Sequence, residues 1–72
     1  MHPSTFLYLN PTDGQLECIT RMRETFAICA SCIEAHVPEG PDRTYLLRQL
    51  RDCAMWANVA ITRHADGSPR TD

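Results

Sequence analysis

The sequence predicts an all-α fold: an antiparallel helical hairpin with an N-terminal arm, assembled into a homo-oligomer. Three observations predict this class. Two segments, about 14–36 and 42–64, repeat apolar residues at the period of a helix. The link 37–41 is rich in proline and glycine and is too short for anything but an antiparallel turn. Segment 46–61 carries more apolar surface than a two-helix hairpin can bury.

Residues 1–13 are expected to form an irregular arm, because prolines punctuate them at positions 3 and 11. An apolar and aromatic cluster, Phe6 to Leu9, lies between the prolines. A free arm is usually more polar than this. We therefore expect the cluster to be held against another surface.

The first helix is expected to start in the segment Thr12–Gln15, because these two end residues have the spacing of a capping box, and to run to about His36. Its apolar stripe consists of Leu16, Ile19, Met22, Phe26, Cys29, Ala30, Ile33 and Val37. Arg23 and Thr25 lie at opposite edges of the stripe, roughly 160° apart around the axis. They can converge on one ligand only if a second copy supplies one of them, as at a twofold interface.

The second helix is expected to have Asp42 as its N-cap and to run to about His64. Its apolar residues cover roughly half of the circumference: Leu46, Leu47, Leu50, Cys53, Ala54, Trp56, Ala57, Ala60 and Ile61. Met55 and Val59 add a smaller patch on the polar side. So much apolar surface on so short a chain needs partners, and a functional site is expected where subunits meet. Residues 65–72 are expected to form a disordered tail.

The charge and composition of the chain indicate which kinds of binding partner are to be expected. The net charge of −2 gives no footprint for DNA, RNA or an anionic membrane. The sequence shows no apolar run long enough to span a membrane and no secretion signal, which predicts a cytosolic protein. All basic residues other than histidine are arginines, whose guanidinium groups suit phosphate, although codon usage in a GC-rich genome also explains them.

Two other readings of the residues are kept as alternatives. One is a zinc-stapled helical interaction module of Cys3His type, held by Cys29, Cys32, His36 and Cys53. The other is a structural adaptor that binds a partner helix through Met55 and Val59. Otherwise the four cysteines, including Cys18, are expected to be reduced and buried as small hydrophobes. A catalytic Cys–His pair is not favoured, because no oxyanion-hole loop or third orienting residue accompanies it.

A set of residues resembles a known family: Phe6 and Tyr8, Pro11, Gln15, Met22 and Arg23, Pro38 and Pro41, Leu50, Arg51, Met55 to Asn58, Ile61 and Arg63. The pattern is similar to the small helical-hairpin sponge proteins that phages use against the bacterial CBASS defence system. It spans about Phe6 to His64, and the Met-Trp-Ala-Asn segment is its most specific part. Leu9 stands where members often carry histidine.

The resemblance implies a non-catalytic protein without a cofactor. Proteins of this family form homohexamers and sequester cyclic dinucleotides between protomers, and some also hold cyclic trinucleotides at separate sites. By resemblance, the dinucleotide contacts are Tyr8, Arg23 and Thr25, and Arg63 is a contact for the larger ligand. The family usually has lysine in place of Arg23. The expected location is the cytoplasm of the infected bacterial host, and the residues leave open which cyclic nucleotide is preferred.

Overall fold

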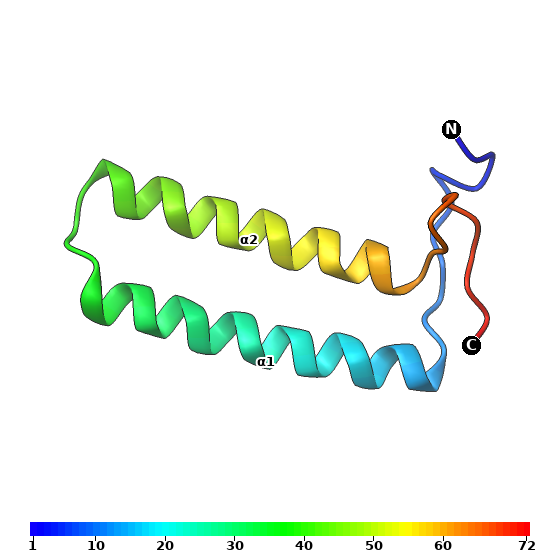
Figure 1. Ribbon diagram of the computed structural model, residues 1–72, viewed down its shortest axis with the longest axis horizontal. Helices are drawn as coiled ribbons and strands as arrows, with labels where there is room; N and C mark the ends of the chain where they lie inside the picture. Colours follow the sequence, from blue (N-terminus) through cyan, green and yellow to red (C-terminus); the bar gives the residue numbers. More distant parts are fainter.

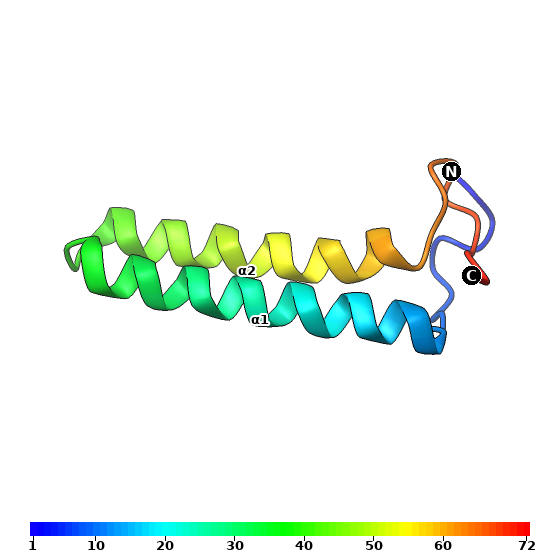
Figure 2. The same ribbon diagram turned by 60° about the horizontal axis from the view of Figure 1, so that its bottom comes forward.

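The computed structural model describes residues 1–72 as two antiparallel helices, α1 (Asp13–His36) and α2 (Pro41–Ile61) (Figure 1). The predicted all-α hairpin is confirmed. The arm and the tail lie together at the open end, opposite the turn (Figure 2). Outside the helices, Arg63 and Pro69 form one isolated antiparallel bridge. Neither helix has the length and apolar character needed to cross a membrane.

The capping box at the start of α1 is confirmed. The Gln15 backbone N–H donates to Thr12 Oγ1 at 3.2 Å, and the Thr12 N–H donates to Gln15 Oε1 at 3.1 Å. These two bonds satisfy N–H groups that the first helical turn leaves without partners. At the other end, the Val37 N–H donates to the Ile33 carbonyl at 2.8 Å, and Val37 takes an extended conformation that ends the helix.

The start of α2 differs from the prediction. The N-cap is Gly40, not Asp42, and its φ of +153° lies where L side chains are rarely found. Pro41 takes the first helical position, where a missing N–H costs nothing because that group would have no partner in the helix. Asp42 lies in the first turn instead, where a negative charge favours the positive end of the helix dipole.

The end of α2 also differs, since the helix stops at Ile61 and not near His64. Thr62 turns the chain: its N–H donates to the Val59 carbonyl at 3.2 Å, and its Oγ1 donates to the same oxygen at 3.0 Å. This tight turn replaces the regular helical bond at that point. The change of direction sends the following residues across the open end of the hairpin.

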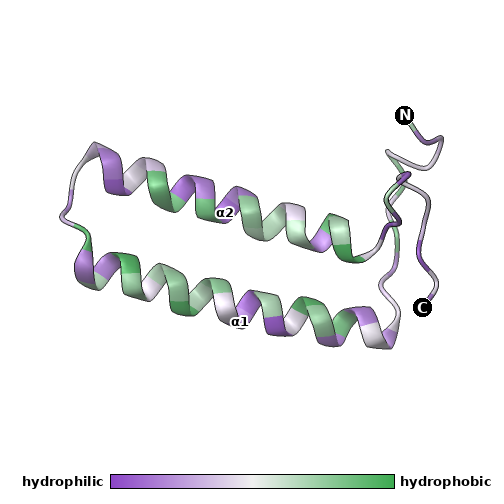
Figure 3. Ribbon diagram, viewed as in Figure 1, coloured by the Kyte–Doolittle hydropathy of each residue, from purple (hydrophilic) through white to green (hydrophobic).

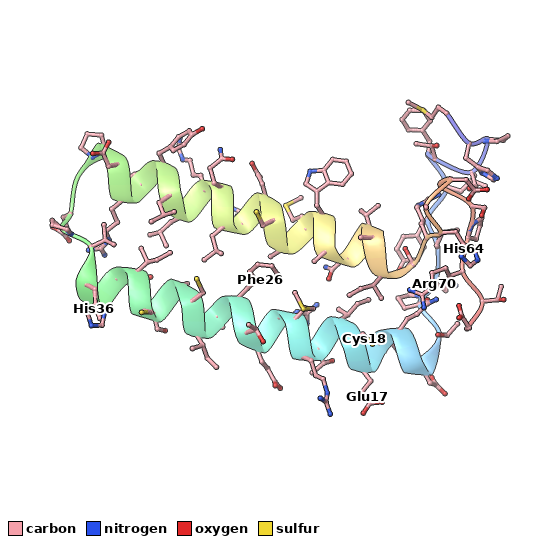
Figure 4. All side chains as sticks on the ribbon, viewed as in Figure 1. Glu17, Cys18, Phe26, His36, His64 and Arg70 are labelled. Atoms are coloured by element: carbon pink, nitrogen blue, oxygen red, sulfur yellow. The ribbon has the colours of Figure 1, made fainter.

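The helices meet along a narrow seam whose residues are buried or half-buried. On α1 and its cap these are Gln15, Ile19, Phe26, Ala30, Ile33 and Val37, and on α2 they are Arg43, Leu47, Leu50, Ala54, Ala57 and Ile61. Figure 4 shows Phe26 pointing from α1 towards α2. Spacings of three and four alternate along α2, as in a coiled coil. Each helix therefore packs one narrow stripe of side chains against the other helix.

Most of the apolar surface lies outside this seam. Four of the 72 residues are buried, and Ile19 is the only apolar one among them. Hydrophobic segments run along both helices (Figure 3). The exposed large apolar side chains are Met1, Phe6, Leu7, Tyr8, Leu16, Met22, Ile28, Tyr45, Leu46, Met55, Trp56 and Val59. The chain on its own thus leaves most of its apolar side chains in contact with water.

The surface area gives the size of this excess. The chain exposes 5772 Å², whereas a folded monomer of its mass is expected to expose about 4,500 Å². Its radius of gyration is 14.9 Å, against about 11 Å for a compact domain of this length. The difference in area exceeds the roughly 800 Å² that each partner buries in a standard protein–protein interface.

The predicted burial of the cysteines is wrong for the single chain. All four, Cys18, Cys29, Cys32 and Cys53, are exposed, and all have free thiols. The physical reason is the width of the seam. The residue that follows each cysteine occupies the buried or half-buried position: Ile19, Ala30, Ile33 and Ala54. A one-residue step turns a side chain by about 100° around the helix.

The tail is folded in the structure, in contrast to the expected disorder. Gly67, with φ of +88°, makes the turn, and the Arg70 N–H donates to the Thr62 carbonyl at 2.9 Å. Asp66 accepts bonds from the Ser68 N–H at 2.9 Å and from the Ser68 hydroxyl at 2.6 Å. Both bonds lower the pKa of the Asp66 carboxyl below its usual value, because they stabilise its charged form.

Gln15 connects this tail to α1. Its side-chain Nε2 donates to the Arg70 carbonyl at 3.2 Å and to the Asp72 carbonyl at 3.0 Å. Gln15 is 2% exposed, and its amide oxygen caps α1 at the same time. One buried amide therefore holds the helix start and the returning tail together, an arrangement that composition could not indicate.

We predict that Thr12→Ala lowers the free energy of unfolding by about 1 kcal/mol, because it removes the acceptor for the Gln15 N–H. Urea unfolding followed by circular dichroism, at one fixed protein concentration, measures the change. Thr20→Ala is the control, since its exposed hydroxyl donates only to the Leu16 carbonyl within α1. Equal stabilities for the two variants would contradict the role given to the capping box.

Candidate functional site

A cavity of about 460 Å³ lies between the arm and the open end of the hairpin. The arm supplies Thr5, Leu7, Tyr8, Leu9 and Pro11; α1 supplies Leu16, Ile19 and Arg23; α2 and the residues after it supply Asn58, Val59, Thr62 and Arg63. Its wall thus combines apolar side chains with two guanidinium groups and one phenol. The arm and the end of α2 lie side by side in both ribbon views (Figures 1 and 2).

The structure brings three of the four residues suggested by the resemblance to this one cavity: Tyr8, Arg23 and Arg63. Thr25 does not line it. Its hydroxyl donates to the Arg21 carbonyl at 2.9 Å, and the side chain is exposed on α1. This placement agrees with the helical geometry, which puts Arg23 and Thr25 on well-separated faces of one helix.

Tyr8 is held out towards solvent. Its side chain is 84% exposed, and that of Phe6 is 89% exposed. The sequence suggested that this aromatic cluster is held against another surface, and a single chain provides no such surface. The ring of Tyr8 is therefore free to stack on a planar ligand or to pack on a second copy.

Arg63 anchors the arm. Its Nη1 donates to Ser4 Oγ at 3.1 Å and to the Gly67 carbonyl at 2.8 Å. Its Nη2 donates to the carbonyls of Ser4 at 2.9 Å, Leu7 at 3.1 Å and Thr5 at 3.5 Å. Both terminal nitrogens of the guanidinium group are thus committed to backbone and hydroxyl oxygens of the protein.

A second, smaller hollow of about 140 Å³ lies against the same arginine, Arg23. It is lined by Arg23, Phe26, Arg51, Ala54, Met55 and Asn58 and contains no carboxylate. The chain has one side-chain ion pair, Arg70 with Asp72, so neither Arg23 nor Arg51 is neutralised within the chain. Two arginines from opposite helices therefore face one hollow without an acidic partner, an arrangement suited to an anion.

The sequence reasoning missed Arg51 as a candidate contact. On the helix it lies next to the seam residues Leu50 and Ala54. The antiparallel register places this edge of α2 against the edge of α1 that carries Arg23. A register worked out from the short turn is the signal that could have indicated the pair.

The structure does not bring together the four ligands of the alternative Cys3His zinc site. No group of three or more His, Cys, Asp or Glu side chains lies close enough to hold an ion. Cys32 Sγ lies 3.8 Å from His36 Nδ1, but that nitrogen also lies 2.9 Å from the Cys32 carbonyl oxygen. A Cys3His site needs four ligands in one place, and the structure brings two together.

The fold and the cavity define the chain as a small all-α hairpin with an arm-lined candidate ligand site. No protein-family model, no curated protein and no solved structure matches it. The arguments about function therefore come from the residues and their placement.

Proposed function

We propose that this protein is a phage-encoded immune antagonist that binds and sequesters cyclic dinucleotides without cleaving them, and so blocks activation of CBASS effectors. It acts in the cytoplasm of the infected bacterial host. The observation that carries the proposal is the placement of Tyr8 and Arg23 around one cavity, from two different segments of the chain, the N-terminal arm and α1. The sequence resemblance to the sponge family supports the same ligand class.

The side chains have the chemistry that such a ligand needs. Tyr8 offers an exposed ring on which a nucleobase can stack, an interaction worth about 1–3 kcal/mol per base. Arg23 offers an unpaired guanidinium group, which binds phosphate through charge-assisted hydrogen bonds. Arg51 offers a second one across the neighbouring hollow, so that each of the two phosphodiesters of the ligand can meet an arginine.

We propose that the binding site is completed between copies of the chain in a homo-oligomer. The resemblance to the sponge family implies that this oligomer is a hexamer. The large exposed apolar surface supports association. Thr25, which lies outside the cavity of its own chain, would reach the ligand from a second copy. A nearly twofold-symmetric ligand can then use each residue type twice, which helps to reach the roughly −12 kcal/mol of nanomolar binding. Binding of cyclic trinucleotides at a separate site belongs to the same proposal.

A structural adaptor that binds a partner helix is the second candidate function. The exposure of Met55 and Val59 on α2 favours it. Val59 borders the larger cavity and Met55 the smaller hollow next to Arg23, so a partner helix seated there would cover the proposed ligand site. The two functions differ in the side chains on which they depend: ligand binding needs Tyr8 and Arg23, whereas the adaptor needs Met55 and Val59.

We predict that Trp56→Glu dissociates the oligomer. Trp56 is 70% exposed and lies outside the seam, so the change leaves the hairpin contacts in place but puts a charge into an apolar interface. Sedimentation velocity at micromolar concentration measures the assembly. Gln49→Glu, which adds the same charge at an exposed polar position of α2, is the control and should leave the assembly intact. A wild-type chain that sediments as a folded monomer would overturn the proposed assembly.

We predict that Tyr8→Ala and Arg23→Ala each weaken binding of a cyclic dinucleotide by about 5–150-fold, corresponding to about 1–3 kcal/mol for a lost stack or phosphate contact. Calorimetric titration with a panel of cyclic di- and trinucleotides provides the measurement. Arg48→Ala, at an exposed position of α2 that lines neither hollow, is the control. If both the Tyr8→Ala and the Arg23→Ala variants still protected phage as well as the wild type does, the adaptor function would be favoured.

The proposal also predicts that the bound ligand is recovered intact. After incubation and heat denaturation of the protein, chromatography should return the cyclic dinucleotide quantitatively, although a receptor could not bind it beforehand. Recovery of a linear dinucleotide would indicate a phosphodiesterase and would contradict sequestration.

We predict that Arg51→Gln weakens dinucleotide binding by about tenfold, the value expected for one charge-assisted contact of roughly 1.4 kcal/mol. Arg48→Gln removes the same charge from the same helix without facing Arg23, and it should leave the affinity unchanged. The same calorimetric titration serves for both. Equal losses in the two variants would show that only the overall charge matters.

A further inference from the structure

The arm that carries Tyr8 is held mainly by one side chain. We propose that Arg63 is a positioning residue: it acts on the cavity by fixing the arm, and therefore the place of Tyr8, and not by contacting the ligand. This inference rests on the proposed function and concerns the same site. The resemblance makes Arg63 a contact for the larger cyclic trinucleotide at a separate site, whereas this inference gives Arg63 a role at the dinucleotide site.

The N–H groups of both terminal nitrogens of Arg63 are used in hydrogen bonds within the protein. Nη1 bonds to Ser4 Oγ and the Gly67 carbonyl, and Nη2 bonds to the carbonyls of Ser4 and Leu7, with Thr5 at a longer distance. Each terminal nitrogen carries two N–H groups, so each of these has an acceptor in the protein. A phosphate would have to break such bonds in order to bind the same nitrogens.

Burial does little to hold the part of the arm that carries Tyr8. The apolar side chains of residues 6–8 are largely exposed and contribute little contact with the hairpin, and among the apolar residues of the arm only Leu9 and Pro11, further along the chain, are half-buried. The buried residue of the arm is Ser4, at 7% exposure, and its hydroxyl and carbonyl are both acceptors for Arg63. The polar contacts of Arg63 are thus the main tie between the arm and the end of α2.

One of these bonds acts directly on the position of Tyr8. The Leu7 carbonyl, which accepts from Arg63 Nη2 at 3.1 Å, belongs to the same planar peptide unit as the Tyr8 nitrogen. Fixing this carbonyl therefore restricts the direction in which the Tyr8 side chain leaves the backbone. A ligand that stacks on Tyr8 then binds a wall already in place and does not have to order the arm.

Lysine cannot reproduce this arrangement. Its ammonium group is a single point with three donors, whereas the planar guanidinium group spreads five N–H groups over a rigid fork. Arg63→Lys therefore keeps the positive charge but cannot reach Ser4, Leu7 and Gly67 together. A direct phosphate contact would be partly kept by lysine, whereas the arm anchor would be lost.

The first test uses the unliganded protein. Hydrogen–deuterium exchange should become faster in Arg63→Lys at the Thr5 and Leu7 amides, which are bonded to the His2 and Ser4 carbonyls in the ordered arm. Exchange in α1 should not change. Ser4→Ala, which removes one acceptor and lies outside the cavity lining, should shift the arm amides in the same direction by less. Arm exchange that stays at the wild-type rate in Arg63→Lys overturns the proposal.

The second test is a double-mutant cycle in ligand affinity. Arg63→Lys should weaken binding of a cyclic dinucleotide by about tenfold if the arm is then in place about a tenth of the time. In a Tyr8→Ala background it should have almost no further effect, because the positioned group is gone. Effects that multiply would instead make Arg63 a direct contact and overturn the positioning role.

The two tests separate this inference from the proposed function. If the wild-type protein binds none of the cyclic nucleotides in the panel, the proposed function fails, while the exchange experiment still decides whether Arg63 orders the arm. Arg48→Lys is the matched control for both, since Arg48 is exposed on α2 and bonds to nothing in the arm. It should change neither arm exchange nor affinity.

Discussion

Two helices can bury only one stripe of side chains against each other, and this constraint governs the rest of the structure. The seam between α1 and α2 takes the residues at heptad-like positions and leaves the others outside, including Trp56 and Ile28. The chain consequently exposes more area than a compact monomer of its mass. Most of its apolar side chains therefore lie on the surface of the chain and not in an internal core. This fits a protein whose site is proposed to be shared between copies.

The same constraint explains why the arm and tail rely on polar contacts. Because Ile19 is the only buried apolar side chain of the whole molecule, Arg63 and Gln15 hold these segments through hydrogen bonds to backbone carbonyls. Such contacts fix geometry well but contribute modest net stability, about 1 kcal/mol each in typical cases. A wall built in this way can be ordered enough to present Tyr8 and still be adjustable when a ligand or a second copy arrives.

Sequence reasoning succeeded where the signal was local. The capping box of Thr12 and Gln15, the turn at 37–41 and the helical periods each depend on a few neighbouring residues, and the structure confirms them. It failed where a shift of one residue decides which face of the helix a side chain occupies, and where a contact joins residues far apart in the sequence. The cysteines lie one step from the seam, Gly40 replaces Asp42 as the N-cap, and the tail is folded by contacts with residues far away in sequence.

The sequence by itself determined the two helices, their antiparallel order and the excess of apolar surface, because periodicity and turn chemistry act over short distances. Only the tertiary structure decided which side chains share a cavity. Arg63 and Ser4 are separated by most of the chain, as are Tyr8 and Val59, and the closure of the hairpin brings each pair to the open end. Contacts of this kind depend on how α1 and α2 are rotated about their axes, a quantity that no local pattern specifies.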